Sequence, residues 1–294
     1  MFATTLALLL VAQPQVASTA EQSNIIVTAP RQADAATVQH YVRAISTTTG
    51  GQLAAFRSPV CPAVFGMPEQ YTVRLVNRIR AVAGRAGMEV APDGCTPNMT
   101  LIFANNSLSA VREMQRLRPG LFNGMATDEV QRLTRGSDPV RAWSLTEVRN
   151  EDGSDFAPGA DDEASRAGGS GGPNMAGSMR VSSSSILTLP TQRVITQSIM
   201  VMDEAATVGK TLNQIADYAA VRGLGGTRSG ASGGAGNSIL GLFDAGATAP
   251  RGLTSLDLAY LQALHATRGN QRSTSHLSRI AERISGQLAA RSPR

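Results

Sequence analysis

Four ionisable side chains in the C-terminal half of the chain are candidates for acid–base chemistry: Asp203, Glu204, Asp217 and His265. A carboxylate beside a histidine can exchange a proton with a substrate. Asp203 and Glu204 follow a predicted strand, where site residues gather in α/β proteins, but where the start of a helix also favours acids. These four groups therefore have two interpretations, a hydrolase site or a set of structural residues.

The sequence contains no established arrangement for metal or phosphate binding. The three histidines, His40, His265 and His276, lack the spacing of a metal-binding pair on one helix. Residues 209–211 resemble the end of a phosphate-binding loop but lack its earlier glycine. The glycine-rich segments have no flanking strand and helix of the kind a dinucleotide site requires. We expect no metal and no cofactor.

The N-terminus has the pattern of a signal peptide over residues 1–20. An apolar run at residues 6–12 is followed by small residues at 18–20, where a signal peptidase would cut. We therefore expect the mature protein to be periplasmic or secreted. No other apolar run reaches the length of a membrane-spanning helix, so we expect no membrane span.

The net charge of +5 comes almost entirely from arginine, since Lys210 is the only lysine. Arg74, Arg78 and Arg85 are predicted to lie on the polar face of one helix, where they could meet an anionic partner. There is little aromatic interleaving and no nucleic-acid motif. These observations favour a solvated face and no nucleic-acid partner.

The two cysteines, Cys61 and Cys95, precede the clearest helix and the clearest strand of the sequence. In an oxidising compartment we expect a disulfide that ties the starts of these two elements together. The alternative is a pair of buried free thiols.

The pattern of apolar residues predicts an α+β fold, with a mixed sheet of about four to five strands packed by helices and a helical C-terminal part. The clearest helix covers residues 67–87, and a buried strand follows at 99–103. Asp128 and Glu129 stand in the first turn of a short predicted helix and are interpreted as structural. Further predicted helices cover residues 33–45, 107–117, 127–133, 211–222, 254–267 and 273–290, and further strands cover 140–148, 185–189 and 194–202.

The predicted organisation has two parts that we expect to form one domain. Residues 21–150 form an N-terminal α/β part, residues 151–180 a flexible loop, and residues 181–294 a hairpin followed by helices. The hairpin is predicted to join the strands at 185–189 and 194–202 through a turn at 190–191. Gly223 is expected to end the helix that Thr211 begins with a capping box.

Residues 24–31, from Asn24 to Arg31, form a short β-prone segment that could be a first strand. The segment also resembles the one that follows the signal peptide in TonB-dependent outer-membrane receptors. There it pairs as an added strand with the energy-transducing protein TonB. The resemblance implies an envelope protein as a partner.

Four motifs, at residues 25–31, 57–62, 138–143 and 250–264, resemble a family of exported bacterial proteins with no assigned function. The order of elements also looks like that of zincin metalloproteases, in which the helix after the last strand carries His-Glu-x-x-His. Here residues 212–220 of that helix contain no histidine, so the resemblance implies the layout without its metal ligands. We therefore expect a non-catalytic envelope or interaction protein. The alternative is an atypical or degenerate hydrolase of zincin-like fold.

Overall fold

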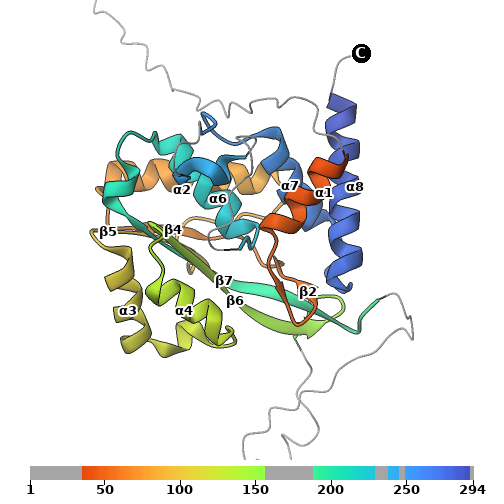
Figure 1. Cartoon of the computed structure of the whole chain (residues 1–294), viewed down its shortest axis with the longest axis horizontal. Coiled ribbons are helices and arrows are strands. Elements are labelled where there is room, and N and C mark those ends of the chain that lie inside the picture. Colours follow the sequence, from red (N-terminus) through yellow and green to blue (C-terminus); the bar gives the residue numbers. More distant parts are fainter. Residues whose placement is uncertain (1–34, 156–187, 229–237, 245–248, 292–294) are drawn as a thin grey trace, which may run out of the picture.

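A computed structural model describes residues 35–155, 188–228, 238–244 and 249–291 (Figure 1). It confirms the α+β prediction, with a mixed five-stranded sheet, helices on both of its faces and a helical C-terminal part. The predicted signal peptide, the segment at 24–31 and most of the predicted loop at 151–180 lie outside the described residues.

The long strand β7 (Thr191–Asp203) is the centre of the sheet. On one side β6 (Val140–Asn150) pairs with it in antiparallel orientation over almost its whole length. On the other side β3 (Ala55–Phe56) and β5 (Met99–Ala104) pair with successive parts of β7 in parallel orientation, and β4 (Pro62–Phe65) lies outside β5. Within the described residues β6 pairs with no strand except β7, so it is an edge strand.

The prediction that residues 185–189 pair with residues 194–202 in a hairpin is wrong. Both sides of β7 are taken by other strands, and the antiparallel neighbour is β6, more than forty positions earlier in the chain. The described residues Thr188 and Leu189 are not in a strand, and the Leu189 N–H donates to the Asn270 carbonyl instead. The apolar run at 185–189 suggested a local pairing, whereas the pairing that forms is long-range.

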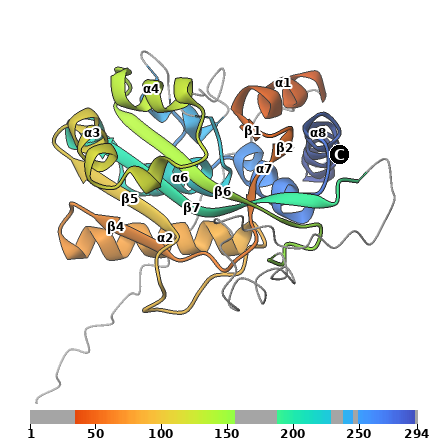
Figure 2. The ribbon, with the colours of Figure 1, turned by 90° about the horizontal axis from the view of Figure 1, so that it is seen from below.

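Alternation along the strands divides the core into two layers, one on each face of the sheet. In β5, Met99, Leu101 and Phe103 face the larger core, which packs against α2 (Glu69–Arg85) and α6 (Leu212–Leu224). Ile102 and Ala104 face the smaller core, under α3 (Ser107–Leu117) and α4 (Thr127–Arg135). Figure 2 shows α2 on one side of the sheet and α3 and α4 on the other.

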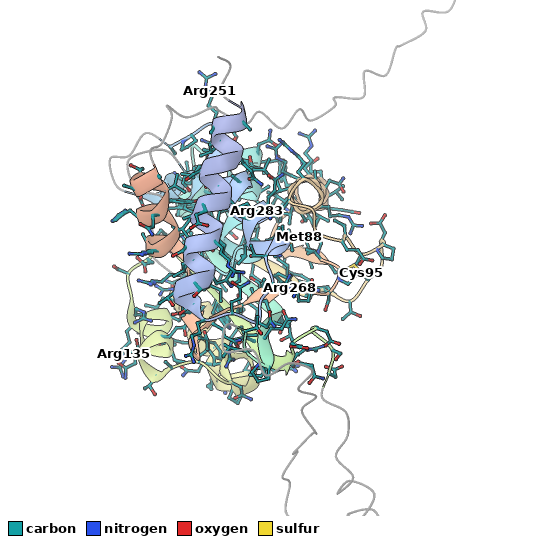
Figure 3. The ribbon with its side chains drawn as sticks, turned by 90° about the vertical axis from the view of Figure 1, so that its right-hand side faces the viewer. Met88, Cys95, Arg135, Arg251, Arg268 and Arg283 are labelled. Atoms are coloured by element: carbon teal, nitrogen blue, oxygen red, sulfur yellow. A yellow bond between two sulfur atoms is a disulfide. The ribbon has the colours of Figure 1, made fainter. Side chains whose placement is uncertain are left out.

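The remaining elements extend the larger core. They are α1 (Ala35–Ile45), the hairpin of β1 (Thr48–Thr49) and β2 (Gln52–Leu53), α7 (Ser255–Ala266) and α8 (Ser273–Arg291). Three 3-10 turns lie elsewhere along the chain: η1 (Pro119–Phe122) between α3 and α4, η2 (Glu204–Thr207) between β7 and α6, and η3 (Ile239–Phe243) between α6 and α7. Figure 3 shows α8 lying lengthwise along this side of the molecule, with Arg283 on it.

Capping boxes begin the two helices that contribute most to the larger core, and the one at Thr211 confirms the prediction from the sequence. Thr211 and Gln214 cap α6, and Thr254 and Asp257 cap α7. Gly223 does not end α6, which continues to Leu224. A Cβ at Gly223 would lie 2.7 Å from the end of the Met99 side chain, so the glycine allows the helix to pack closely on the sheet.

The predicted disulfide between Cys61 and Cys95 is confirmed, with 6.1 Å between the two Cα atoms. Cys61 directly precedes β4, a strand that the sequence analysis missed, and Cys95 precedes β5. The bond therefore joins the starts of two neighbouring parallel strands. Asn98 reinforces the same place, since its side chain accepts from the Cys61 N–H at 2.8 Å and donates to the Pro59 carbonyl at 2.9 Å.

Candidate functional site

Asp203 and Glu204, at the carboxyl end of β7, have separate surroundings. A carboxylate oxygen of Asp203 accepts from the Ser107 backbone N–H at the start of α3. Glu204 begins the η2 turn and is exposed. Asp203 therefore connects α3 to the sheet, so its role is structural.

Asp217 is fully buried in α6 and forms a two-bonded ion pair with Arg78 of α2. The guanidinium donates to the two carboxylate oxygens at 2.7 and 2.8 Å, and the Leu253 N–H donates to the same carboxylate at 2.7 Å. Arg78 was expected on a solvated face, and its burial corrects that expectation. The pair connects α2, α6 and the segment before α7, so Asp217 is a structural residue.

His265 lies near the opposite end of β7 from Asp203. It lines an open hollow of about 690 Å³ together with Gln192, near the start of the strand. Burial, followed by the nearby charge of Arg57, lowers the pKa of His265 to about 4, and its Nε2 atom lies 3.3 Å from the Leu224 carbonyl oxygen. Gln192 and Asp203 lie eleven positions apart along the strand, which corresponds to roughly 35 Å. The four candidates therefore do not form one acid–base site.

The described residues also contain no group of three His, Cys, Asp or Glu side chains that could hold a metal ion. In α6, the helix that follows the last strand of the sheet, Asp217 is held in its ion pair with Arg78. Nothing in the described part of this helix replaces a zinc ligand.

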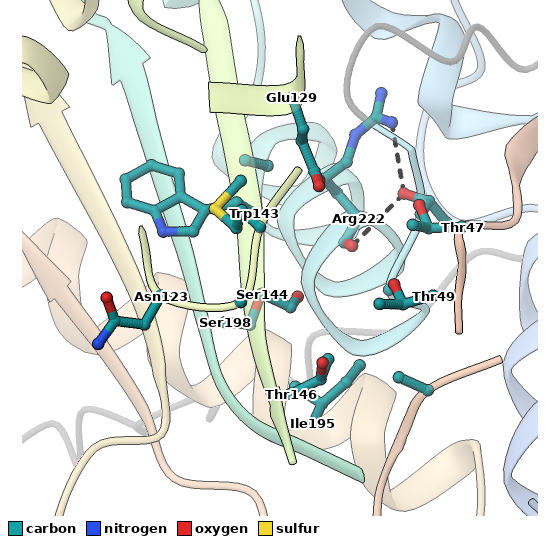
Figure 4. A pocket seen from close by; sticks show the side chains of 16 residues that line it. Thr47, Thr49, Asn123, Glu129, Trp143, Ser144, Thr146, Ile195, Ser198 and Arg222 are labelled. Atoms are coloured by element: carbon teal, nitrogen blue, oxygen red, sulfur yellow. Dashed lines mark hydrogen bonds between the residues drawn. The ribbon is translucent and has the colours of Figure 1, made fainter. Parts of the chain in front are cut away.

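A narrow groove lies beside residues 142–146 at the unpaired edge of β6, and it is more enclosed than the hollow beside His265 (Figure 4). It encloses about 40 Å³, which is room for a few waters or a small side chain. Its walls come from elements far apart in the sequence, namely the segment between η1 and α4 on one side and the segments around β1 and the end of α6 on the other. Its lining residues include Thr47, Thr49, Asn123, Met125, Glu129, Trp143, Ser144, Thr146, Ser198, Arg222 and Thr227.

Trp143 and Arg222 are fixed in opposite walls of this groove. The indole N–H of Trp143 donates to the Leu121 carbonyl at 2.8 Å, and its ring stacks on Phe122 with centroids 5.1 Å apart. The Arg222 guanidinium donates to the Tyr218 hydroxyl at 3.0 and 3.2 Å and to Thr227 at 3.3 Å. Both side chains are therefore held in place by bonds to the protein itself.

Glu129, in the first turn of α4, supplies the carboxylate of the groove. Burial, which outweighs the opposing effect of Arg132, raises the pKa of this half-buried side chain. Arg132 itself pairs with Asp128 at 2.6 Å. Within the described residues no basic group lies within ion-pair distance of Glu129, so its charge is partly desolvated and unpaired.

The groove residues suit binding better than catalysis. Ser144 and Ser198 offer hydroxyls, but no histidine or cysteine lies among the groove residues in the described part of the chain. A serine nucleophile needs an adjacent base, and neither serine has a histidine beside it. What the groove offers is hydroxyls, an aromatic ring and one carboxylate at the edge of a sheet.

Sequence reasoning missed this site because its residues meet only through the tertiary fold. Glu129 was assigned a structural role as a first-turn acid, and Trp143 was recognised only as part of a strand. The one signal available in the sequence was that the strand at 140–148 contains the only tryptophan.

Comparison of the chain with models of protein families, with curated proteins and with solved structures found no match. No helix in the described part of the chain is long and apolar enough to cross a membrane.

Proposed function

We propose that this chain is an exported, non-catalytic protein of the cell envelope, periplasmic or secreted, that binds an extended polypeptide along β6. The observation that carries the proposal is the groove at the unpaired edge of this strand. The disulfide between Cys61 and Cys95 is consistent with export, since such bonds persist mainly in oxidising compartments.

The edge of β6 suits a peptide because a strand presents backbone N–H and C=O groups along both of its sides. One side of β6 is bonded to β7 along the strand, and on the other side residues 142–146 lie beside the groove. A peptide that adds a strand there would satisfy those groups. Its alternate side chains would point toward the α4 wall and toward the β1 wall.

A hydrolase is the second candidate, because α6 follows the last strand of the sheet and reaches the same groove through Arg222. The candidate keeps the zincin-like order of elements as an expectation from the sequence. The absence of metal ligands in the described part of α6 argues for binding without cleavage. Incubation of bound peptides with the purified protein, with and without added zinc, separates the two candidates, because only a hydrolase yields cleavage products.

The binding test uses an array of acetylated and amidated nonapeptides of random sequence. Thr49 lines the groove from β1, whereas its neighbour Thr48 is exposed and is not among the groove residues. We expect Thr49→Phe to weaken peptide binding at least tenfold by filling the groove, and the matched control Thr48→Phe to bind as the unmodified protein does.

Backbone chemistry decides whether the peptide binds as a strand. We expect methylation of alternate peptide nitrogens to abolish binding, because it removes the donors that pair with β6. Absence of binding by every peptide, or equal binding by the methylated ones, contradicts the proposal.

A further inference from the structure

Among the described residues that line the groove, Glu129 is the only one with an acidic side chain. It is half-buried, and no basic group in the described residues lies within ion-pair distance of it. A carboxylate that has lost part of its hydration without gaining a partner is stabilised strongly by an incoming cation. Its neighbour Asp128 differs in both respects, since it is exposed and pairs with Arg132.

The surroundings of Glu129 also favour a cation. Trp143 lines the same groove, but its ring is buried and stacks on Phe122, so it contributes apolar surface and the polar groups carry the preference for a cation. The other polar groups there are mostly neutral hydroxyls, including the partly exposed Thr47, Thr49 and Ser144, which can accept hydrogen bonds from a basic group.

Arg222 does not make the groove a site for acidic ligands. Its side chain is buried, it donates to Tyr218, Thr227 and the Arg228 carbonyl, and its guanidinium lies 5.1 Å from the centroid of the Tyr218 ring. Its charge is therefore engaged within its own wall, whereas Glu129 feels only the more distant positive charge of Arg132 and forms no ion pair within the described residues.

We propose that the groove selects a polypeptide with a basic side chain, lysine or arginine, and that Glu129 is the residue that recognises it. This inference rests on the proposed binding of a peptide along β6. It adds the chemical class of the bound segment and the residue that determines the specificity.

The test compares two series of acetylated and amidated nonapeptides on a background of serine, threonine and valine. In one series a single lysine moves through the central positions, and in the other a glutamine does. For the unmodified protein we expect at least one lysine position to bind tenfold or more tightly than its glutamine counterpart. Raising the salt concentration should reduce this preference.

The variants Glu129→Gln and Asp128→Asn form a matched pair, since each removes one carboxylate from the first turn of α4. We expect Glu129→Gln to bind the preferred lysine peptide at least tenfold more weakly and to bind the glutamine peptides as before. Asp128→Asn should retain the lysine preference. Thermal unfolding of both variants verifies that α4 remains folded.

The outcomes separate this inference from the proposed function. If peptides bind through their backbones but lysine gives no advantage, or Glu129→Gln leaves the advantage intact, the inference is wrong and strand binding stands. If no peptide of either series binds the unmodified protein, both are wrong.

Discussion

His276 is a fully buried histidine with one ring nitrogen bonded and the other unpartnered within the described structure. Its Nε2 atom lies 2.7 Å from the Thr267 hydroxyl, and Nδ1 has no partner. Burial, followed by the charges of Arg57 and Arg279, lowers the pKa of His276 to about 4. In the unfolded chain the group would take up a proton near pH 6.5. Between these values the unfolded state binds more protons, so stability falls as the pH falls.

We predict that His276→Gln reduces this acid sensitivity, because glutamine is neutral and can still bond to Thr267. A shift from 6.5 to about 4 corresponds to a loss of up to about 3 kcal/mol between pH 7 and pH 4 in the unmodified protein. Urea unfolding at pH 7, 5 and 4 measures it. His40→Gln, at an exposed histidine of α1, is the control and should keep the original pH dependence. Equal pH dependence of His276→Gln and the unmodified protein would contradict the prediction.

At the residue scale, the sequence predicts features set by near neighbours. The capping partners Thr211 and Gln214 are three residues apart, and the structure confirms them. Arg78 and Asp217 are 139 residues apart, and only the packing of α2 against α6 brings them together. The periodicity of α2 predicted that Arg78 faces solvent, because the pattern of one helix carries no information about the helix that packs against it.

Among the elements, the end of β4 depends on a glycine whose surroundings admit no side chain. Gly66 has a φ of +83°, and a Cβ there would lie 2.1 Å from the Phe103 carbonyl oxygen of the neighbouring strand. A backbone oxygen in a sheet cannot move away as a flexible side chain can. Gly87, after α2, has a similar φ of +80° but no atom within 4 Å of the same position.

We predict that Gly66→Ala lowers the free energy of unfolding by more than about 3 kcal/mol, since it combines positive-φ strain with a collision in the sheet. Gly87→Ala should cost only the backbone strain, about 1 to 2 kcal/mol. Urea unfolding of both variants gives the comparison. Equal losses would show that the strand β4 moves freely away from β5.

Element length decides how much of the secondary structure the sequence predicts. The helix expected at 67–87 and the strand expected at 99–103 appear as α2 and β5, because each has a clear apolar pattern. The strands β1, β2 and β3 have two residues each and β4 has four, which is too short for any periodicity. The groove beside β6 depends on one of these short strands, so it could not be predicted either.

For the whole molecule, the disulfide closes a loop that contains α2 and joins two strands of the sheet. The chain-entropy estimate for a loop of 34 positions is a stabilisation of roughly 3 to 4 kcal/mol. We predict that the double variant Cys61→Ser, Cys95→Ser loses about this much in urea unfolding. Reduction of the unmodified protein should have the same effect. Unchanged stability would mean that the asparagine bonds around Asn98 suffice to hold the two strand starts.

The fold class follows from the sequence, but the arrangement of the sheet does not. Composition and periodicity indicate a mixed sheet with a helical C-terminal part. They do not indicate that residues 191–203 lie between strands drawn from residues 55–56, 99–104 and 140–150. The strand order depends on how all the strands together bury apolar side chains on both faces of the sheet. A local sequence pattern does not contain this information.

The central position of β7 has a consequence for the growing polypeptide. β3, β5 and β6 pair with β7, and β4 joins them through β5. When the ribosome has synthesised the first 150 residues, four strands of the sheet exist but the central strand β7 does not yet. A premature stop codon anywhere before Thr191 would therefore yield an N-terminal fragment with strands but no common neighbour, and such a fragment is a natural target for chaperones and proteases.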